Sequence, residues 1–280
     1  MTSRGGSTIG ELLDTAFAAY RKHGVLLAVT AAAVLLPTML LTICGFAGVL
    51  NTLVGVLASV VATVQASEAL LGGRPTLIGG LGVGVRRFVP ALLSLVFLLV
   101  TVVAATLPFA VLARLANPQF SGFTPAEFGG ALIVLAALWA VAISWVALRY
   151  FALIPVATLE PGASAPDRST ALARGAYGRI MLVSLIGGLI SGAPLVLVGG
   201  VQAVVAGMHD RGQVPFSLVV LIAILAWIAG SIVGPFGNML NTALYYDRRD
   251  HLEHLGAPAA DVVVKIGDAK AVSFATAPSR

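Results

Sequence analysis

The chain has 280 residues, of which 58% are hydrophobic and 10% are charged, and its mean hydropathy is +0.98. Soluble domains contain roughly 45–50% apolar and about 25% charged residues, so this composition excludes a soluble protein and indicates one surrounded by lipid. The net charge of +5 does not predict a nucleic-acid partner, because the basic residues lie at the ends of apolar runs instead of forming one patch.

The first expected element is an amphipathic helix over about residues 8–22. Thr8 and Glu11 have the spacing of a capping box, in which each residue's side chain accepts a hydrogen bond from the other's backbone. Apolar residues then recur at helical intervals as far as Tyr20, and the charged residues fall largely on the opposite face. This pattern is typical of a helix that lies in the membrane interface.

Two later segments, 82–96 and 173–186, also place basic and aromatic residues just before an apolar run. Together with the first junction they predict three helical hairpins, each preceded by a cytoplasmic interfacial helix. Two explanations account for this likeness. The three hairpins can descend from one repeated unit, or each can simply show the basic junction of any hairpin whose inner side is positively charged.

The apolar runs are long enough to cross a bilayer, which takes about 20 residues of helix. Because these runs are apolar on every side, helices are favoured over the alternating strands of a barrel. The expected fold class is therefore all-α, a polytopic membrane bundle of about six transmembrane helices with cytoplasmic interfacial helices. Residues 1–250 form the expected transmembrane domain, with spans at about 24–45, 49–71, 89–112, 129–152, 180–206 and 215–246.

The distribution of Lys and Arg predicts which side of the membrane each loop occupies, since cytoplasmic flanks collect basic residues. Six spans with both termini in the cytoplasm place nearly all basic residues inside, and the tyrosines lie at the same boundaries. The expected location is the cytoplasmic membrane. The inner residues are Arg4, Arg21, Lys22, Arg74, Arg86, Arg87, Arg149, Arg168, Arg174, Arg179, Arg248 and Arg249, and the outer ones are Arg114 and Arg211.

Charged residues near membrane depth are the first candidates for a site, because an Arg or Asp at the bilayer centre costs roughly 2.5–3.5 kcal/mol. Glu68 lies near the inner end of the second span, Arg149 at the inner boundary of the fourth, and Glu160 after it. Arg149 and Glu160 are about 16 Å apart along one helix, so an ion pair between Arg149 and Glu68 is expected instead. Such a pair predicts a pocket for a lipid phosphate; the alternative is a snorkelling arginine with a structural counter-ion.

The last span contains a second candidate, a helix break at Pro235 followed by Asn238 and Asn241. Proline removes a backbone donor and kinks a helix, and amide side chains beside a kink can line a substrate path, as in transporters. The structural alternative, in which the asparagines cap or bridge neighbouring helices, is favoured.

No pattern in the sequence predicts an enzyme. The chain contains a single cysteine, Cys44, and His251 and His254 lack the further ligands of a closed metal site. No residue stands in a recognisable nucleophile setting, so neither a cofactor nor a catalytic residue is expected. Residues 251–280 lack a sustained amphipathic pattern and are expected to form a flexible cytoplasmic tail.

Four segments together resemble a known family: ELLDTAFAAYRKHG at 11–24, WVALRYFALIPVATLEPG at 145–162, ALARGAYGRI at 171–180 and NTALYYDRR at 241–249. The chain is similar over about residues 8–252 to the membrane-domain family named for its attachment to some bacterial glycerophosphoryl diester phosphodiesterases. In that family a separate soluble barrel supplies the catalytic groups. Such a barrel takes at least ~200 residues, for which this chain has no room. The resemblance implies a prokaryotic membrane protein without that activity.

The function expected from the sequence is therefore a non-enzymatic scaffold or accessory subunit of the membrane. Its expected partners are membrane lipids, anionic ones among them, and a membrane or cytoplasmic protein. The alternative is a transporter of small molecules or lipids, or a lipid-binding protein, built around Glu68, Arg149 and the break in the last span.

Overall fold

The structure is a computed structural model that describes residues 8–43, 49–116, 130–209 and 215–253. These ranges contain helices and short connections and no strand, which confirms the expected all-α fold. The expected tail lies outside the described residues, apart from its first three, which belong to the last helix. In chain order the helices are α1 (Ile9–Ile43), α2 (Val49–Leu70), α3 (Leu77–Ala116), α4 (Gly130–Arg149), α5 (Leu153–Leu159), α6 (Ala165–Ala173), α7 (Tyr177–His209) and α8 (Phe216–Glu253).

The number of spanning helices agrees with the sequence. Within the described ranges, five segments are long and apolar enough to cross a membrane: α1, α2, α3, α8 and the stretch Ile133–Leu159. A sixth is added if α6 and the first half of α7, which meet at a bend of 103°, count as one span. The chain is accordingly a multi-pass helical bundle.

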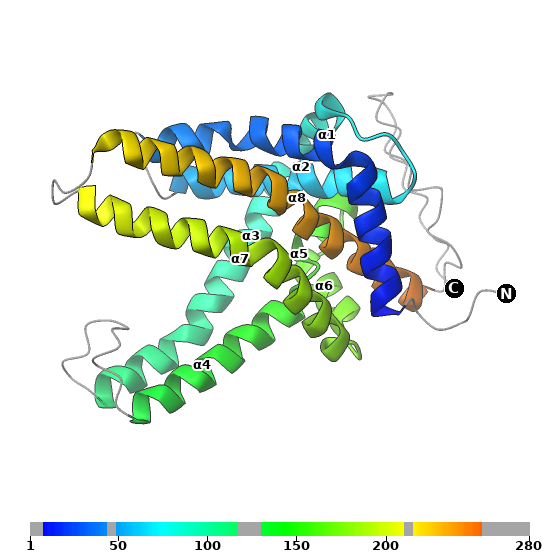
Figure 1. The fold of residues 1–280 in the computed structure, drawn as a ribbon. Helices are drawn as coiled ribbons and strands as arrows, with labels where there is room; N and C mark the ends of the chain where they lie inside the picture. The colour runs from blue at the N-terminus through cyan, green and yellow to red at the C-terminus, as the bar shows by residue number, and fades with distance from the viewer. Residues whose placement is uncertain (1–7, 44–48, 117–129, 210–214, 254–280) are drawn as a thin grey trace.

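Helix α1 begins with the expected capping box. The backbone N–H of Thr8 donates to Glu11 Oε2 at 2.6 Å, and the backbone N–H of Glu11 donates to Thr8 Oγ1 at 3.2 Å. An interfacial helix separate from the first span was expected here. The two form one helix instead, because α1 continues from Ile9 to Ile43. Figure 1 shows instead that the first turns of α1 (darkest blue) run across the direction of the rest of the helix.

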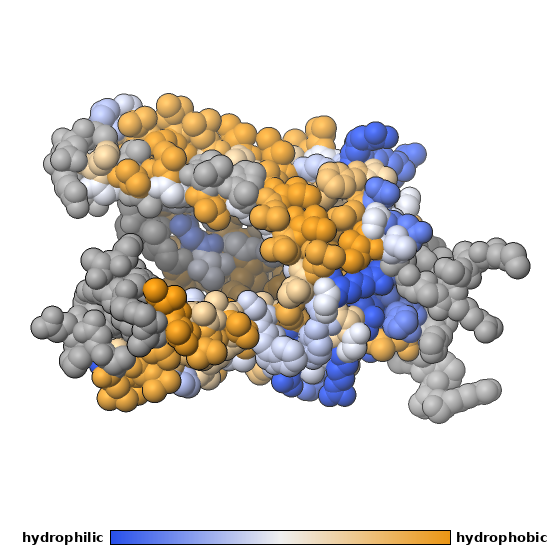
Figure 2. All heavy atoms as spheres, turned by 60° about the horizontal axis from the view of Figure 1, so that its bottom comes forward, coloured by the Kyte–Doolittle hydropathy of each residue, from blue (hydrophilic) through white to orange (hydrophobic). Residues whose placement is uncertain are grey.

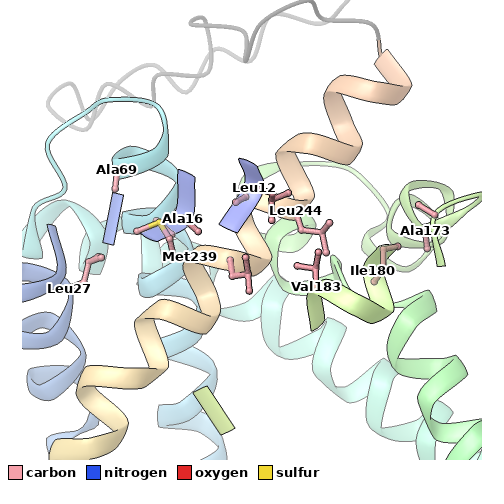
Figure 3. Close-up of a cluster of buried hydrophobic side chains, with 13 residues drawn as sticks. Leu12, Ala16, Leu27, Ala69, Ala173, Ile180, Val183, Met239 and Leu244 are labelled. Atoms are coloured by element: carbon pink, nitrogen blue, oxygen red, sulfur yellow. The ribbon is translucent and has the colours of Figure 1, made fainter. Parts of the chain in front are cut away.

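The apolar stripe of these first turns packs against protein. Leu12 and Ala16 are buried in a cluster with Met239 and Leu244 of α8, and Ile180 of α7 belongs to the same cluster (Figure 3). The first turns of α1 therefore close one end of the bundle against α8.

The second and third junctions differ from each other. Residues 82–96 of the second lie inside α3, so no separate interfacial helix precedes this span. The third, 173–186, begins at the last residue of α6, passes through the turn containing Gly175 and continues into α7. Gly175 has φ of 72°, a left-handed conformation that glycine adopts without steric cost, and α7 then starts in a new direction.

The bundle divides into two limbs. Helices α1, α2, α7 and α8 run together, whereas the α3–α4 hairpin diverges from them (Figure 1). The most apolar 18-residue window of α3 contains no buried residue, so this limb presents its surface outward. Viewed from the underside, the molecule is hollowed between hydrophobic limbs, and hydrophilic residues gather at the opposite end (Figure 2). We call this end, formed by α5, α6, the first turns of α1 and the last turns of α8, the polar end.

Candidate functional site: the polar end of the bundle

The connection between α4 and α5 is held by side chains from other helices. The buried Ser169 hydroxyl of α6 donates to the Arg149 carbonyl at 3.4 Å and accepts from the Ala152 N–H at 3.2 Å. Asn241 of α8 donates through Nδ2 to the Phe151 carbonyl at 3.2 Å. Backbone groups at a helix end must find partners when they are buried, so these contacts stabilise the interruption after α4.

The last turns of α8 reach several helices in succession. Arg248 is buried, and its guanidinium donates to the carbonyls of Leu172 and Arg174 at 3.1 Å each. These carbonyls belong to the last turn of α6 and the residue after it, where no intrahelical donor is available. Arg248 of α8 therefore caps the C-terminus of α6, although the two helices are far apart in the sequence.

Glu160, at the end of α5, is the centre of a charged network. Arg168 of α6 donates through Nε to Glu160 Oε2 at 2.9 Å, and Tyr245 of α8 donates its hydroxyl proton to Glu160 Oε1 at 2.6 Å. Arg168 also pairs with Glu253, which accepts from Arg249 at 2.8 Å. This network ties α5 and α6 to the end of α8 and occupies both oxygens of the Glu160 carboxylate.

Two further contacts connect the same stretch of α8 to α2 and α7. The Tyr246 and Ser67 hydroxyls are 2.7 Å apart, and Arg179 of α7 pairs with Asp247 at 3.0 Å. Consecutive residues of the YYDRR segment therefore contact α5, α2, α7 and α6 in turn.

The structure does not bring the three predicted site residues together. Arg149 is exposed and donates to the hydroxyl of Thr170 at 3.4 Å, with its guanidinium 5.8 Å from the Tyr150 ring. Within the described residues no ion pair joins Arg149 to Glu68, so the predicted pair is wrong. The physical reason is that α4 ends at Arg149, and the end of α4 is held by α6.

Glu68 keeps one unusual feature. Its Oε2 atom is buried and has no hydrogen-bond partner in the described part of the chain. A buried polar atom without a partner is costly and calls for an explanation. Its place at the inner end of α2 was expected, and its isolation from Arg149 was not.

The predicted break in the last span is not a break in the helix. α8 continues through Pro235 to Glu253. Asn238 donates through Nδ2 to the Gly234 carbonyl in its own helix at 3.2 Å, whereas Asn241 bridges to Phe151. The favoured alternative, asparagines that cap or bridge neighbouring helices, describes the contact of Asn241 but not that of Asn238.

The polar side chains of the polar end mainly join helices to one another. In the described ranges no group of three or more His, Cys, Asp or Glu side chains could hold a metal ion. Three basic side chains without an ion-pair partner in the described ranges lie in the turn before α3 and in the first half of α3. Arg74 and Arg86 there are exposed, and Arg87 is partly exposed.

Comparison of the chain with protein-family models, with curated proteins and with solved structures found no match. The resemblance to the phosphodiesterase-associated membrane domain therefore stays a prediction that depends on the four quoted segments.

Sequence reasoning did not identify Ser169, Tyr245 and Arg248 as residues that organise the fold. A signal was present, because the segments ALARGAYGRI and NTALYYDRR carry the resemblance and contain or adjoin these positions. What the sequence did not reveal is that both segments meet, one capping the helix of the other.

Proposed function

We propose that this protein is a non-enzymatic scaffold or accessory subunit of the cytoplasmic membrane, with its polar end and both termini in the cytoplasm. The observation that carries the proposal is how the most polar stretch of the chain is used. Each side chain from Tyr245 to Arg249 bonds to another helix or to its own helix, and the cavity that Tyr246 and Asp247 also line is small, about 140 Å³. Residues committed to internal contacts are not available for a substrate, so the polar end gives the bundle a fixed shape.

The contact surface for a partner is the basic region of Arg74, Arg86 and Arg87. Their side chains have no ion-pair partner in the described ranges, and a cluster of positive charge attracts an acidic partner at the membrane surface. The partner that fits this region is an acidic segment of a membrane or cytoplasmic protein. The excess of basic residues in this region and at the polar end also supports the cytoplasmic orientation.

A second function, lipid binding or transport, rests on Glu68. A buried carboxyl oxygen without a partner can receive a proton, a cation or the polar group of a lipid in a membrane protein. Lipid binding or transport requires a bound small molecule, whereas a scaffold does not require one.

Mass spectrometry of the protein extracted in native-lipid nanodiscs separates these two functions. We expect a recurring partner protein that is lost when Arg74, Arg86 and Arg87 are replaced together by glutamine. The same partner should remain with the Glu68→Gln, Arg149→Gln variant, which serves as the matched control. A stoichiometric small molecule or lipid that is lost only from the Glu68→Gln, Arg149→Gln variant would favour lipid binding or transport. A protein that always purifies without a partner would contradict the scaffold function.

A further inference from the structure

A groove of about 760 Å³ follows one face of α1 and is closed on one side by Ile232 of α8. Most of its α1 residues recur at three- and four-residue intervals, so they form a continuous strip on one face of the helix. The strip passes from a charged part to an apolar part. Along α1 it includes Asp14, Phe17, Arg21, Val25 and Ala28.

The floor of the groove is fixed by contacts between α1 and α8. The Tyr20 hydroxyl donates to the Ile232 carbonyl. The Phe17 ring lies 4.6 Å from the Phe236 ring, and the Tyr20 ring lies 5.6 Å from it in an edge-to-face arrangement. These contacts hold the two helices together beneath the groove and make it a preformed surface.

The apolar part of the groove is uncovered. Val25 is 83% exposed, although it belongs to the apolar run that begins at Gly24, and Phe17, which lies between Asp14 and Arg21, is 47% exposed. In a membrane-spanning helix such a surface contacts hydrocarbon, so the occupant must have an apolar portion that continues along the span.

The charged part of the groove contains one group of each sign. Asp14 and Arg21 are exposed, and neither has an ion-pair partner in the described part of the chain. Their Cα atoms are separated by about 10 Å along the helix axis, at 1.5 Å per residue. Seven residues are about two helical turns, so Asp14 and Arg21 lie on the same face of α1 and both line the groove. The groove therefore offers one carboxylate and one guanidinium about two turns apart.

We propose that this groove binds one phospholipid whose headgroup carries both a phosphate and a primary ammonium group, the phosphatidylethanolamine class. The phosphate lies at Arg21, whose planar fork of donors suits phosphate oxygens, and the ammonium lies at Asp14. An acyl chain follows Val25 and Ala28 along the span, and Phe17 lies beneath the headgroup, between Asp14 and Arg21. An anionic headgroup without an amine would leave Asp14 unpaired beside a negative charge, which disfavours it. This inference goes beyond the proposed accessory function, because it concerns a lipid and a different set of residues.

The test is lipid retention from vesicles that contain equal amounts of phosphatidylethanolamine and phosphatidylglycerol with identical acyl chains. The purified full-length protein is reconstituted and extracted, and the bound lipids are counted by native mass spectrometry. We expect phosphatidylethanolamine to be retained above its share of the vesicle. Asp14→Asn should lower the ratio of the two bound lipids about twofold to fivefold, the size expected for one exposed ion pair. Arg21→Gln should lower retention of both lipids, because both carry a phosphate.

Two matched variants serve as controls. Lys22→Gln removes the neighbouring exposed positive charge, and Asp250→Asn removes an exposed carboxylate at the far end of α8; neither residue lines the groove. Both should retain lipid as the unchanged protein does, with the same melting temperature as Asp14→Asn and Arg21→Gln. Equal retention of the two lipids by the unchanged protein, a preference for phosphatidylglycerol, or the same behaviour of Asp14→Asn and Asp250→Asn would overturn the proposal.

Discussion

At the scale of single residues, the end of α8 shows how adjacent arginines can contribute very differently. Arg248 is buried and supplies donors to two carbonyls at the end of α6. Arg249 is partly exposed and pairs with Glu253, four residues later in its own helix. Buried groups that lose a partner keep the full cost of desolvation, whereas partly exposed pairs contribute little.

Replacement of Arg248 by alanine should therefore destabilise the protein by about 2–4 kcal/mol, because two carbonyls of α6 would be left without donors. Replacement of Arg249 by alanine should cost about 0.5 kcal/mol, the value of a helical pair four residues apart. Thermal unfolding of both variants in the same detergent measures the difference. Equal melting temperatures would show that the Arg248 cap does not contribute.

At the scale of secondary-structure elements, the connection of α4 to α5 depends on a side chain from α8. Asn241 donates to the Phe151 carbonyl at this connection, while Asn238, one turn earlier, contacts only its own helix. Asn241→Ala should reduce the free energy of unfolding by about 1–3 kcal/mol, since it leaves a backbone acceptor unpaired. Asn238→Ala should change it by less than about 0.5 kcal/mol. The comparison is made by unfolding in detergent, and a larger loss for Asn238→Ala would contradict the bridging role of Asn241.

The contact between α2 and α3 depends on a glycine. A Cβ atom at Gly84 would lie 2.6 Å from Val61 Cγ2, whereas one at Gly82 would have open space around it. Val61 is buried and β-branched, so its side chain cannot easily turn away.

Gly84→Ala should for this reason be less stable than Gly82→Ala by about 1–3 kcal/mol, the usual cost of overpacking. The gain in helix propensity is common to both variants and cancels in the comparison. Melting temperatures measured side by side provide the test. Equal stability of the two variants would mean that α2 and α3 do not approach each other at this position.

At the scale of the whole molecule, composition and charge predicted the all-α membrane bundle, and the capping spacing predicted the start of α1. The way the helices pack could not be predicted, because lipid-facing and protein-facing surfaces are both apolar in a membrane protein. The divergence of the α3–α4 hairpin is one consequence (Figure 1).

The polar residues were partly predictable for a related reason. Glu160 was singled out by its position near the membrane, but its partners Arg168 and Tyr245 lie on other elements. The sequence does not show which elements meet, so a pair expected between Arg149 and Glu68 could not be distinguished from the contact of Arg149 with Thr170.

We propose that the helices cross the membrane and that the polar end faces the cytoplasm. Cys44 is the only cysteine, so a Cys44→Ala background allows single cysteines to be placed at chosen positions. The exposed positions Ala163 and Asp250 report on the polar end, and Val49 and Pro215 on the opposite end.

The decisive measurement is labelling of these four single-cysteine variants in intact cells by a maleimide that does not cross the membrane. We expect Val49→Cys and Pro215→Cys to react in intact cells, and Ala163→Cys and Asp250→Cys to react only after lysis. Labelling of Ala163→Cys from outside, or equal labelling at both ends of the bundle, would refute the cytoplasmic position of the polar end.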